Sequence, residues 1–168
     1  MNLQDTIAGL EARLRLVEDK EKIREVLARY GYNADLGRSE EYVDVWTDDG
    51  LYDLGAVKYA GKDQIREMIS SPTGVHKTQI ENRSLHTVCN LHIGVEGETA
   101  WAEGYSIVFV KGGDGAVKVL TAGYNHWDFV RAGDSWLMTR RLRRDVGGDE
   151  WGGETINRYL EPSAPSAS

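Results

Sequence analysis

Asp35 and His86 are the two residues of this chain whose side chains most clearly suggest chemistry. Asp35 lies near the end of a stretch with helical periodicity, and His86 opens a half of the chain that is rich in strand-forming residues. A carboxylate that faces an imidazole fixes the tautomer of the ring and stabilises the imidazolium, so such a pair can act as a general base. The residues alone leave open an alternative, in which an exposed Asp ends a helix and an ordinary His lies in a strand.

The first half of the chain is expected to be mainly helical. Apolar residues recur at helical spacing between Asp5 and Leu36, with Asp5 placed to cap the start and Gly37 placed to cap the end. A charged stretch at residues 18–22 leaves open whether this region is one helix or two. Shorter elements are expected to follow, namely helices at residues 39–46 and 61–69 and, between them, a strand at residues 51–54.

The second half alternates apolar and polar residues as an antiparallel sheet does. Glycine-containing turns separate its segments, so consecutive strands are expected to pair. A long helix packed on a strongly curved sheet forms a cone, and small-molecule pockets often form in the mouth of such a cone. The predicted fold class is therefore α+β. The expected strands span residues 84–95, 99–111, 117–130 and 135–144.

The 168 residues are expected to form one domain, long enough to enclose a core and a pocket. We place this domain at residues 1–146, of which residues 1–20 are an N-terminal helical extension. Residues 147–160 contain several glycines around Trp151 and are expected to cover the pocket. The polar tail at residues 161–168 has the composition of a disordered segment.

The composition excludes several classes of partner. A net charge of −7 argues against nucleic acid and against an anionic membrane. No apolar run approaches the ~20 residues that span a membrane, and the N-terminus lacks the basic and apolar regions of a signal peptide. The single cysteine, Cys89, excludes an intrachain disulfide and fits a reducing compartment. We therefore expect a soluble cytoplasmic protein whose partner is a small molecule.

The four histidines do not follow a metal-ligand pattern. His86 and His92 are six residues apart on one expected strand, which separates them by about 20 Å at ~3.3 Å per residue. His76 falls in an expected loop, and His126 falls in a different strand. We therefore expect neither a metal nor a cofactor.

Several motifs occur in a fixed order along the chain. They are Glu21-Lys22-Ile23-Arg24-Glu25-Val26-Leu27-Ala28-Arg29-Tyr30, Asp35, Val45-Trp46-Thr47-Asp48-Asp49-Gly50, Tyr59-Ala60-Gly61-Lys62-Asp63-Gln64-Ile65, His86-Thr87-Val88-Cys89-Asn90 and Asp134-Ser135-Trp136. Through this ordered set, the chain resembles the SnoaL-like branch of the NTF2-like, ketosteroid isomerase-type superfamily, over about residues 18–145. Within that branch it is similar to scytalone dehydratase, bile-acid dehydratase and lindane dehydrochlorinase. The resemblance implies an NTF2-like cone, with a long N-terminal helix and two shorter helices on a mainly antiparallel sheet.

The resemblance also implies an activity. The resembled enzymes carry a catalytic Asp at the end of the first long helix and a His at the start of the sheet, and these positions fall on Asp35 and His86. A cofactor-independent lyase acting on a cyclic, largely apolar small molecule is therefore expected. In such an enzyme His86 removes a proton from carbon and Asp35 orients the ring. Two alternatives stay open: an isomerase or cyclase of a polyketide-like or steroid-like substrate that uses the same base, and a non-catalytic module that binds a small ligand.

Further site residues follow from the resemblance. Arg141, five residues after Trp136, falls at the position of an Arg that stabilises departing negative charge. Asn125 and Tyr30 fall at positions that contact the substrate. The neighbouring arginines that remain alternatives to Arg141 are Arg140, Arg143 and Arg144.

The chain departs from the family pattern at one position. The tyrosine that assists the leaving group in the dehydratases would fall near Gly55, which has no side chain to offer. Tyr105 is the preferred replacement because it lies in the middle of an expected strand. The other candidates for substrate contact are Tyr52, Tyr124 and, as the lining of an apolar pocket, Trp46.

The chain is also expected to assemble with copies of itself. If His86 points into the cone, alternate residues of the same strand point away and give the outer face of the sheet an apolar patch, which normally meets a partner. The resemblance implies a homo-oligomer, with a trimer favoured over a dimer. The residues expected on the outer face are Leu85, Thr87, Cys89, Leu91 and Ile93.

Overall fold

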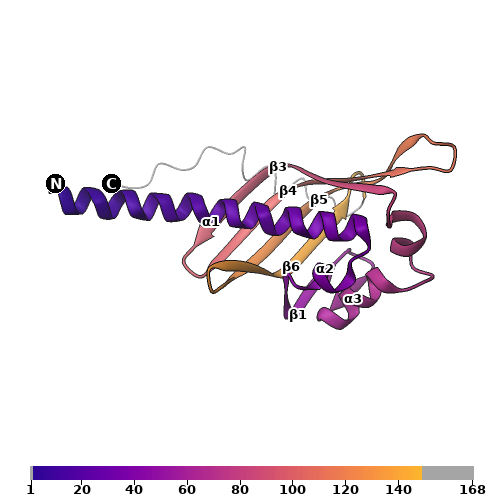
Figure 1. Ribbon diagram of the computed structural model, residues 1–168, viewed down its shortest axis with the longest axis horizontal. Coiled ribbons are helices and arrows are strands. Elements are labelled where there is room, and N and C mark those ends of the chain that lie inside the picture. The colour runs from indigo at the N-terminus through magenta and orange to yellow at the C-terminus, as the bar shows by residue number, and fades with distance from the viewer. Residues whose placement is uncertain (1, 149–168) are drawn as a thin grey trace.

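A computed structural model describes residues 2–148 of the chain, in which one long helix crosses a curved sheet and shorter helices close one end (Figure 1). The helices are α1 (Leu3–Leu36), α2 (Ser39–Val43), α3 (Lys62–Ser70) and a short π-helical turn, η1 (His76–Ile80). The strands are β1 (Trp46–Asp53), β2 (Lys58–Ala60), β3 (Ser84–Glu96), β4 (Thr99–Lys111), β5 (Val117–Ala132) and β6 (Ser135–Asp145). The expected pocket-covering segment at residues 147–160 lies, from residue 149 on, outside the described residues, and so does the expected tail at residues 161–168.

The sheet is a single mixed layer with the strand order β2-β1-β6-β5-β4-β3. Strands β3 to β6 form the antiparallel meander that the alternation predicts, whereas β1 pairs with β6 in parallel. The predicted α+β cone with a long N-terminal helix is therefore confirmed, with one parallel pair added to the mainly antiparallel sheet.

Helix α1 is continuous through the charged stretch at residues 18–22, so the region is one helix rather than two. A capping box starts it: the Asn2 side chain accepts a hydrogen bond from the Asp5 backbone N–H at 2.9 Å, and the Asp5 side chain accepts one from the Asn2 N–H. The expected cap at Asp5 is thus one turn too late. Gly37 ends the helix in the left-handed conformation, with φ of 66°. No helix among residues 2–148 combines the length and the apolar character needed to cross a bilayer.

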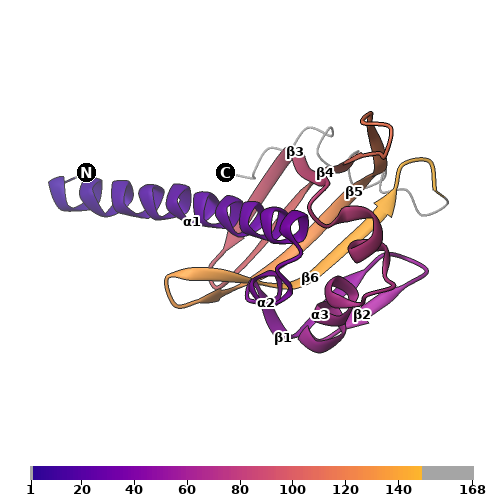
Figure 2. The ribbon, with the colours of Figure 1, turned by 45° about the vertical axis from the view of Figure 1, so that its right-hand side comes forward.

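Only the second half of α1 packs on the sheet. Ile23, Val26, Leu27 and Tyr30 are buried, and they join a core that includes tryptophans, a phenylalanine and a methionine from the strands. The first half of α1 extends past the edge of the sheet (Figures 1 and 2). The core residues contributed by the strands include Trp46, Trp127, Phe129, Trp136 and Met138.

An irregularity in β3 changes which residues face the core. The pairing of β3 with β4 shifts between Cys89 and His92, and Asn90 adopts a positive φ of 52°. Beyond this bulge the alternation slips by one residue, so that Ile93 is buried in the core and Leu91 packs against it. The prediction that Leu91 and Ile93 lie on the outer face is therefore wrong.

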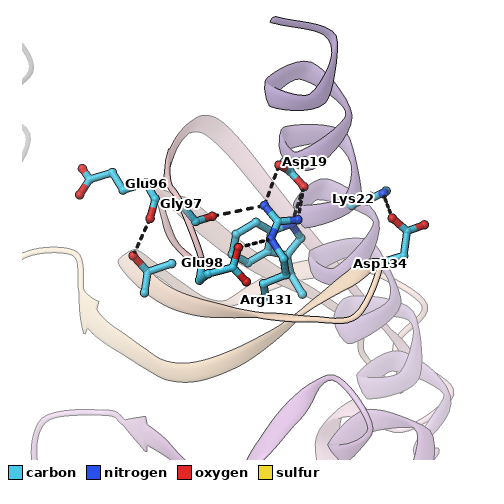
Figure 3. A network of polar contacts seen from close by, with 9 residues as sticks. Asp19, Lys22, Glu96, Gly97, Glu98, Arg131 and Asp134 are labelled. Atoms are coloured by element: carbon cyan, nitrogen blue, oxygen red, sulfur yellow. Dashed lines mark hydrogen bonds and ion pairs between the residues drawn. The ribbon is translucent and has the colours of Figure 1, made fainter. Parts of the chain in front are cut away.

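A polar clamp holds the middle of α1 to the two hairpins of the sheet (Figure 3). The Arg131 guanidinium donates to both carboxylate oxygens of Asp19, at 2.8 and 2.9 Å, and stacks over the Trp136 ring at 4.4 Å. The Trp136 indole N–H donates to the same carboxylate at 3.2 Å. Arg131 also reaches Glu98 in the β3–β4 turn, so the clamp joins both hairpins to α1 where the helix leaves the sheet.

The clamp predicts an acid-sensitive contribution to stability. The Arg131 hydrogen bond lowers the pKa of Asp19 below its usual value, and it outweighs the burial that would raise it. Asp19→Ala should lower the free energy of unfolding at pH 7 by about 2 kcal/mol, since a charge-assisted hydrogen-bond pair is lost. A group with a lowered folded pKa stabilises above its unfolded pKa of about 4, and this contribution is lost as the pH falls through the folded value. Urea titrations from pH 7 down to pH 3 should therefore show the difference between wild type and variant shrinking.

The matched control is Asp134→Ala. Asp134 lies in the β5–β6 turn and contacts Lys22 of the same helix. Asp134 pairs with Lys22 at 2.6 Å, but its side chain is 95% exposed, so the pair should contribute little. Equal losses of stability for Asp19→Ala and Asp134→Ala would show that the buried clamp has no special role.

Candidate active site

Asp35 and His86 are in direct contact. The Nδ1 atom of His86 lies 2.6 Å from Oδ1 of Asp35, and the side chains are only 15% and 16% exposed. Ser84 donates its hydroxyl to Oδ1 at 2.5 Å, and the backbone N–H of His86 donates to Oδ2 at 3.0 Å. Since both carboxylate oxygens are occupied, the carboxylate is fixed and the imidazole is oriented with Nε2 on the side away from Asp35.

The ends of two elements bring this pair together. Asp35 lies in the last turn of α1, and His86 is the third residue of β3. The backbone N–H of Asn82 donates to the Asp35 carbonyl at 2.8 Å, which ties the end of the helix to the segment that enters the strand. The alternative of an unconnected Asp and His, which the sequence left open, does not apply.

The contacts around Asp35 keep it ionised. Burial acts to raise the pKa of the Asp35 carboxyl, but hydrogen bonds from the His86 ring, Ser84 and the His86 backbone outweigh it and hold the pKa below its usual value. A permanently charged carboxylate on Nδ1 favours the tautomer with the proton on that nitrogen, which leaves Nε2 free to accept a proton.

Two cavities meet at His86. One of about 430 Å³ lies between the second half of α1 and the start of β3. The other, of about 320 Å³, lies inside the cone and is lined mainly by apolar and aromatic side chains. Three residues, Tyr30, His86 and Arg141, line both cavities. A base and a cation therefore face the same space.

Arg141 is buried without a carboxylate partner. Its exposed fraction is 4%, and it forms no ion pair with any acidic residue among residues 2–148. The guanidinium donates to the hydroxyls of Tyr30 and Tyr52, the latter at 2.8 Å, and Nε donates to Asn125 at 2.9 Å. It also lies over the rings of both tyrosines, 4.9 and 4.7 Å from their centroids. A buried cation held only by neutral groups is suited to receive negative charge from a ligand.

The phenols around Arg141 are placed as hydrogen-bond donors. Burial raises the pKa of Tyr30 and that of Tyr42, so both are neutral at pH 7. The Tyr30 oxygen lies within hydrogen-bond distance of Arg141 and of the Tyr42 hydroxyl. Because Arg141 can only donate, Tyr30 and Tyr52 each accept from it and keep their own protons to donate.

Of the remaining expected site residues, some line a cavity and others do not. Asn125 is fully buried behind Arg141 and donates to Ser106 at 2.7 Å, so it orients the guanidinium rather than lining a cavity. Tyr52 lies in the inner cavity. Trp46 and the preferred tyrosine, Tyr105, line neither cavity: Trp46 is fully buried in the core, and Tyr105 lies next to Ser106, which faces the helix side.

His76 is a site residue that the sequence did not suggest. It is buried on η1, lines the inner cavity, and has no hydrogen-bond partner within 3.5 Å for either ring nitrogen. Burial, with a smaller effect from His86, lowers the pKa of His76, so its ring is neutral at pH 7. The sequence analysis expects a loop at His76, whereas the structure places this residue on a helical turn that carries it inward.

Comparisons with known proteins agree with this architecture. A domain model described as SnoaL-like matches residues 15–142. An NTF2-like protein with a cystatin-like fold from Novosphingobium aromaticivorans is 32% identical, with a TM-score of 0.77 over 93% of this chain and 97% of that chain. No curated protein matches the chain.

Two further solved structures from Novosphingobium aromaticivorans share the fold. One protein, provisionally named an aromatic ring hydroxylase, is 26% identical, with a TM-score of 0.66 over 79% of this chain and 92% of that chain. Another, provisionally named a scytalone dehydratase, is 15% identical, with a TM-score of 0.67 over 79% and 87% of the two chains, and at this identity it shows the fold alone. With three quarters of its length matched by the domain model, the chain belongs to the SnoaL-like domain family and has the NTF2-like fold.

Proposed function

We propose that this protein is a cofactor-independent lyase that eliminates water or another small leaving group from a cyclic, largely apolar molecule. The observation that carries the proposal is the Asp35–His86 pair, whose imidazole faces a mainly apolar cavity that also contains a buried guanidinium. A module that only binds a ligand has no need of an oriented base. A solved structure of the same fold is provisionally named a scytalone dehydratase, and that name supports the same reaction class.

The proposed reaction begins at Nε2 of His86. This nitrogen takes a proton from a carbon next to the leaving group, and the C–H electron pair becomes the new C=C bond or an enolate that precedes it. The Asp35 carboxylate, 2.6 Å from Nδ1, stabilises the imidazolium that forms. The proton can then leave with the departing group or return to solvent, which restores the neutral base.

Arg141 and its two phenols are the proposed site of departing or developing negative charge. Tyr52 lies in the inner cavity and donates from a hydroxyl that Arg141 polarises at 2.8 Å. Tyr30 lines both cavities and has the same relation to Arg141. These two tyrosines supply the acid that the absent side chain at Gly55 cannot, and Tyr105 is no longer needed for the role.

The first test is the removal of the base. A panel of cyclic β-hydroxy ketones is incubated with the protein, and elimination is followed by the ultraviolet absorbance of the conjugated enone. His86→Ala should slow turnover by about 10²–10⁴-fold, the usual contribution of a positioned base. Asp35→Asn should cost less, because it leaves the imidazole in place while losing its orientation and charge support.

Tyr105→Phe is the matched control, since this tyrosine lines neither cavity and its loss should leave turnover unchanged. Full activity in His86→Ala would contradict the proposal. A product of unchanged mass would instead support the isomerase or cyclase alternative, in which the base returns its proton to another atom.

The second test separates activity from stability at Arg141. Arg141→Met should reduce turnover by about 10²–10³-fold, as the loss of a charge-stabilising donor does in other enzymes. The same change should leave the free energy of unfolding unchanged or raise it by up to about 2 kcal/mol, because it removes a buried charge that no carboxylate compensates. Urea titration alongside the enone assay measures both quantities. A large loss of stability would show that Arg141 serves the fold rather than the reaction.

A further inference from the structure

An apolar stripe runs along the part of α1 that projects past the sheet. Its five residues follow one another at alternating steps of four and three, which is the heptad spacing of a coiled-coil seam. All are exposed, with exposed fractions between 47% and 77%, although large apolar side chains normally lie inside. The stripe consists of Leu3, Ile7, Leu10, Leu14 and Val17.

The stripe faces away from the protein's own sheet. At 3.6 residues per turn, its mean direction lies about 180° around the helix from that of Ile23, Val26 and Tyr30, which pack on the sheet. The helix is continuous between the two sets, so their relative direction is fixed. The described part of the domain therefore cannot cover the stripe, and Figures 1 and 2 show the helix extending beyond it.

The stripe has a defined beginning and end. The capping box of Asn2 and Asp5 starts the helix directly before Leu3. The next two seam positions after Val17 are Glu21 and Arg24, which pair with each other at 3.3 Å and end the apolar surface. The clamp at Asp19 holds the helix to the sheet at this same point.

We propose that residues 3–20 of α1 form a parallel, two-stranded coiled coil with a second copy of this chain. In the heptad, Ile7 and Leu14 occupy a positions, and Leu3, Leu10 and Val17 occupy d positions. The first heptad, with Ile7 at a and Leu10 at d, has the β-branched and leucine combination that favours two strands, whereas the second heptad, with Leu14 at a and Val17 at d, does not add to this preference.

The flanking charges select the parallel orientation. The e positions hold Glu11, Glu18 and Glu25, and the g positions hold Arg13 and Lys20. In a parallel pair each g residue faces the e residue five places later in the partner, so Arg13 meets the partner's Glu18 and Lys20 meets the partner's Glu25. An antiparallel pair would bring g to g and e to e, and thus like charges together. None of these five side chains forms an ion pair within residues 2–148.

The direction of the stripe makes this pairing sterically feasible. Because the sheet lies on the opposite side of each helix, a two-fold axis along the seam places the two domains on the outside of the coil. The inner cavity stays inside the cone of each domain. The cavity between α1 and β3 is lined by α1 residues from Arg24 onward, beyond the end of the proposed coil. The proposed contact between helices is separate from the outer face of the sheet and leaves that face free for a second contact between copies.

Cysteine crosslinking tests the seam and its orientation. In a Cys89→Ser background, which removes the native exposed thiol, Leu10→Cys places a thiol at a d position of each chain. A parallel, in-register pair brings the two copies of residue 10 together, so mild oxidation should give a covalent dimer. Ala12→Cys, at the outward f position of the same turn, is the matched control and should not crosslink.

Charge reversal tests the flanking pairs by sedimentation. The mass of the Arg13→Glu/Lys20→Glu variant should be lower than that of the wild type, and half of it where the coil is the only contact between copies. Mixing this variant with a Glu18→Lys/Glu25→Lys chain should restore the wild-type mass, because the g and e positions are again of opposite sign. Far-ultraviolet circular dichroism checks that both variants remain folded. A mass unaffected by the reversals, with equal crosslinking at residues 10 and 12, would overturn the proposal; such a result is also expected if a different protein covers the stripe.

Discussion

One buried guanidinium constrains how the cone closes. Arg141 of β6 contacts Tyr30 of α1, Tyr52 of β1 and Asn125 of β5, and no acidic residue within residues 2–148 neutralises it. Burying a charge is costly unless its hydrogen-bond donors are satisfied, so the helix and three strands must meet with these oxygens in place. The parallel pairing of β1 with β6, which sets Tyr52 opposite Arg141, is part of the same requirement. The group that is suited to receive negative charge thus lies at the point where α1 and three strands meet.

The base is made by the same contacts that dock the end of α1. Three donors, from Ser84 and from the ring and backbone of His86, converge on one carboxylate, and the Asn82 N–H binds the adjacent carbonyl. None of these groups is near Asp35 in the sequence, so the base exists only when the last turn of the helix sits on β3. Its geometry is then determined by backbone as well as side chains, which is how an imidazole is held to a single tautomer and direction.

The parts of the fold that depend on local pattern could be predicted from the sequence, and the parts that depend on distant pairing could not. Helical periodicity and glycine turns located α1 and the four long strands to within a few residues. The bulge at Asn90 left no local signal, because apolar and polar residue types continue to alternate in the sequence while the side of the sheet that they face changes. Likewise β4 is apolar on both faces around Ile107, so its pattern could not show that Tyr105 lies outside the cavities. The sequence offered Tyr30 and Tyr52 as candidates, but their shared contact with Arg141 and the place of His76 in the same cavity depend on how distant elements meet.

Along the continuous helix α1, the number of residues between the exposed stripe and the buried face sets the angle between them. The two apolar faces keep their relative direction only if the number of residues between them is unchanged, since each residue turns the helix by about 100°. A single residue inserted after Val17 would rotate the projecting turns by that amount and leave every contact of Asp35 and His86 in place. The proposed coiled coil therefore restricts insertions and deletions in this segment to lengths near whole turns.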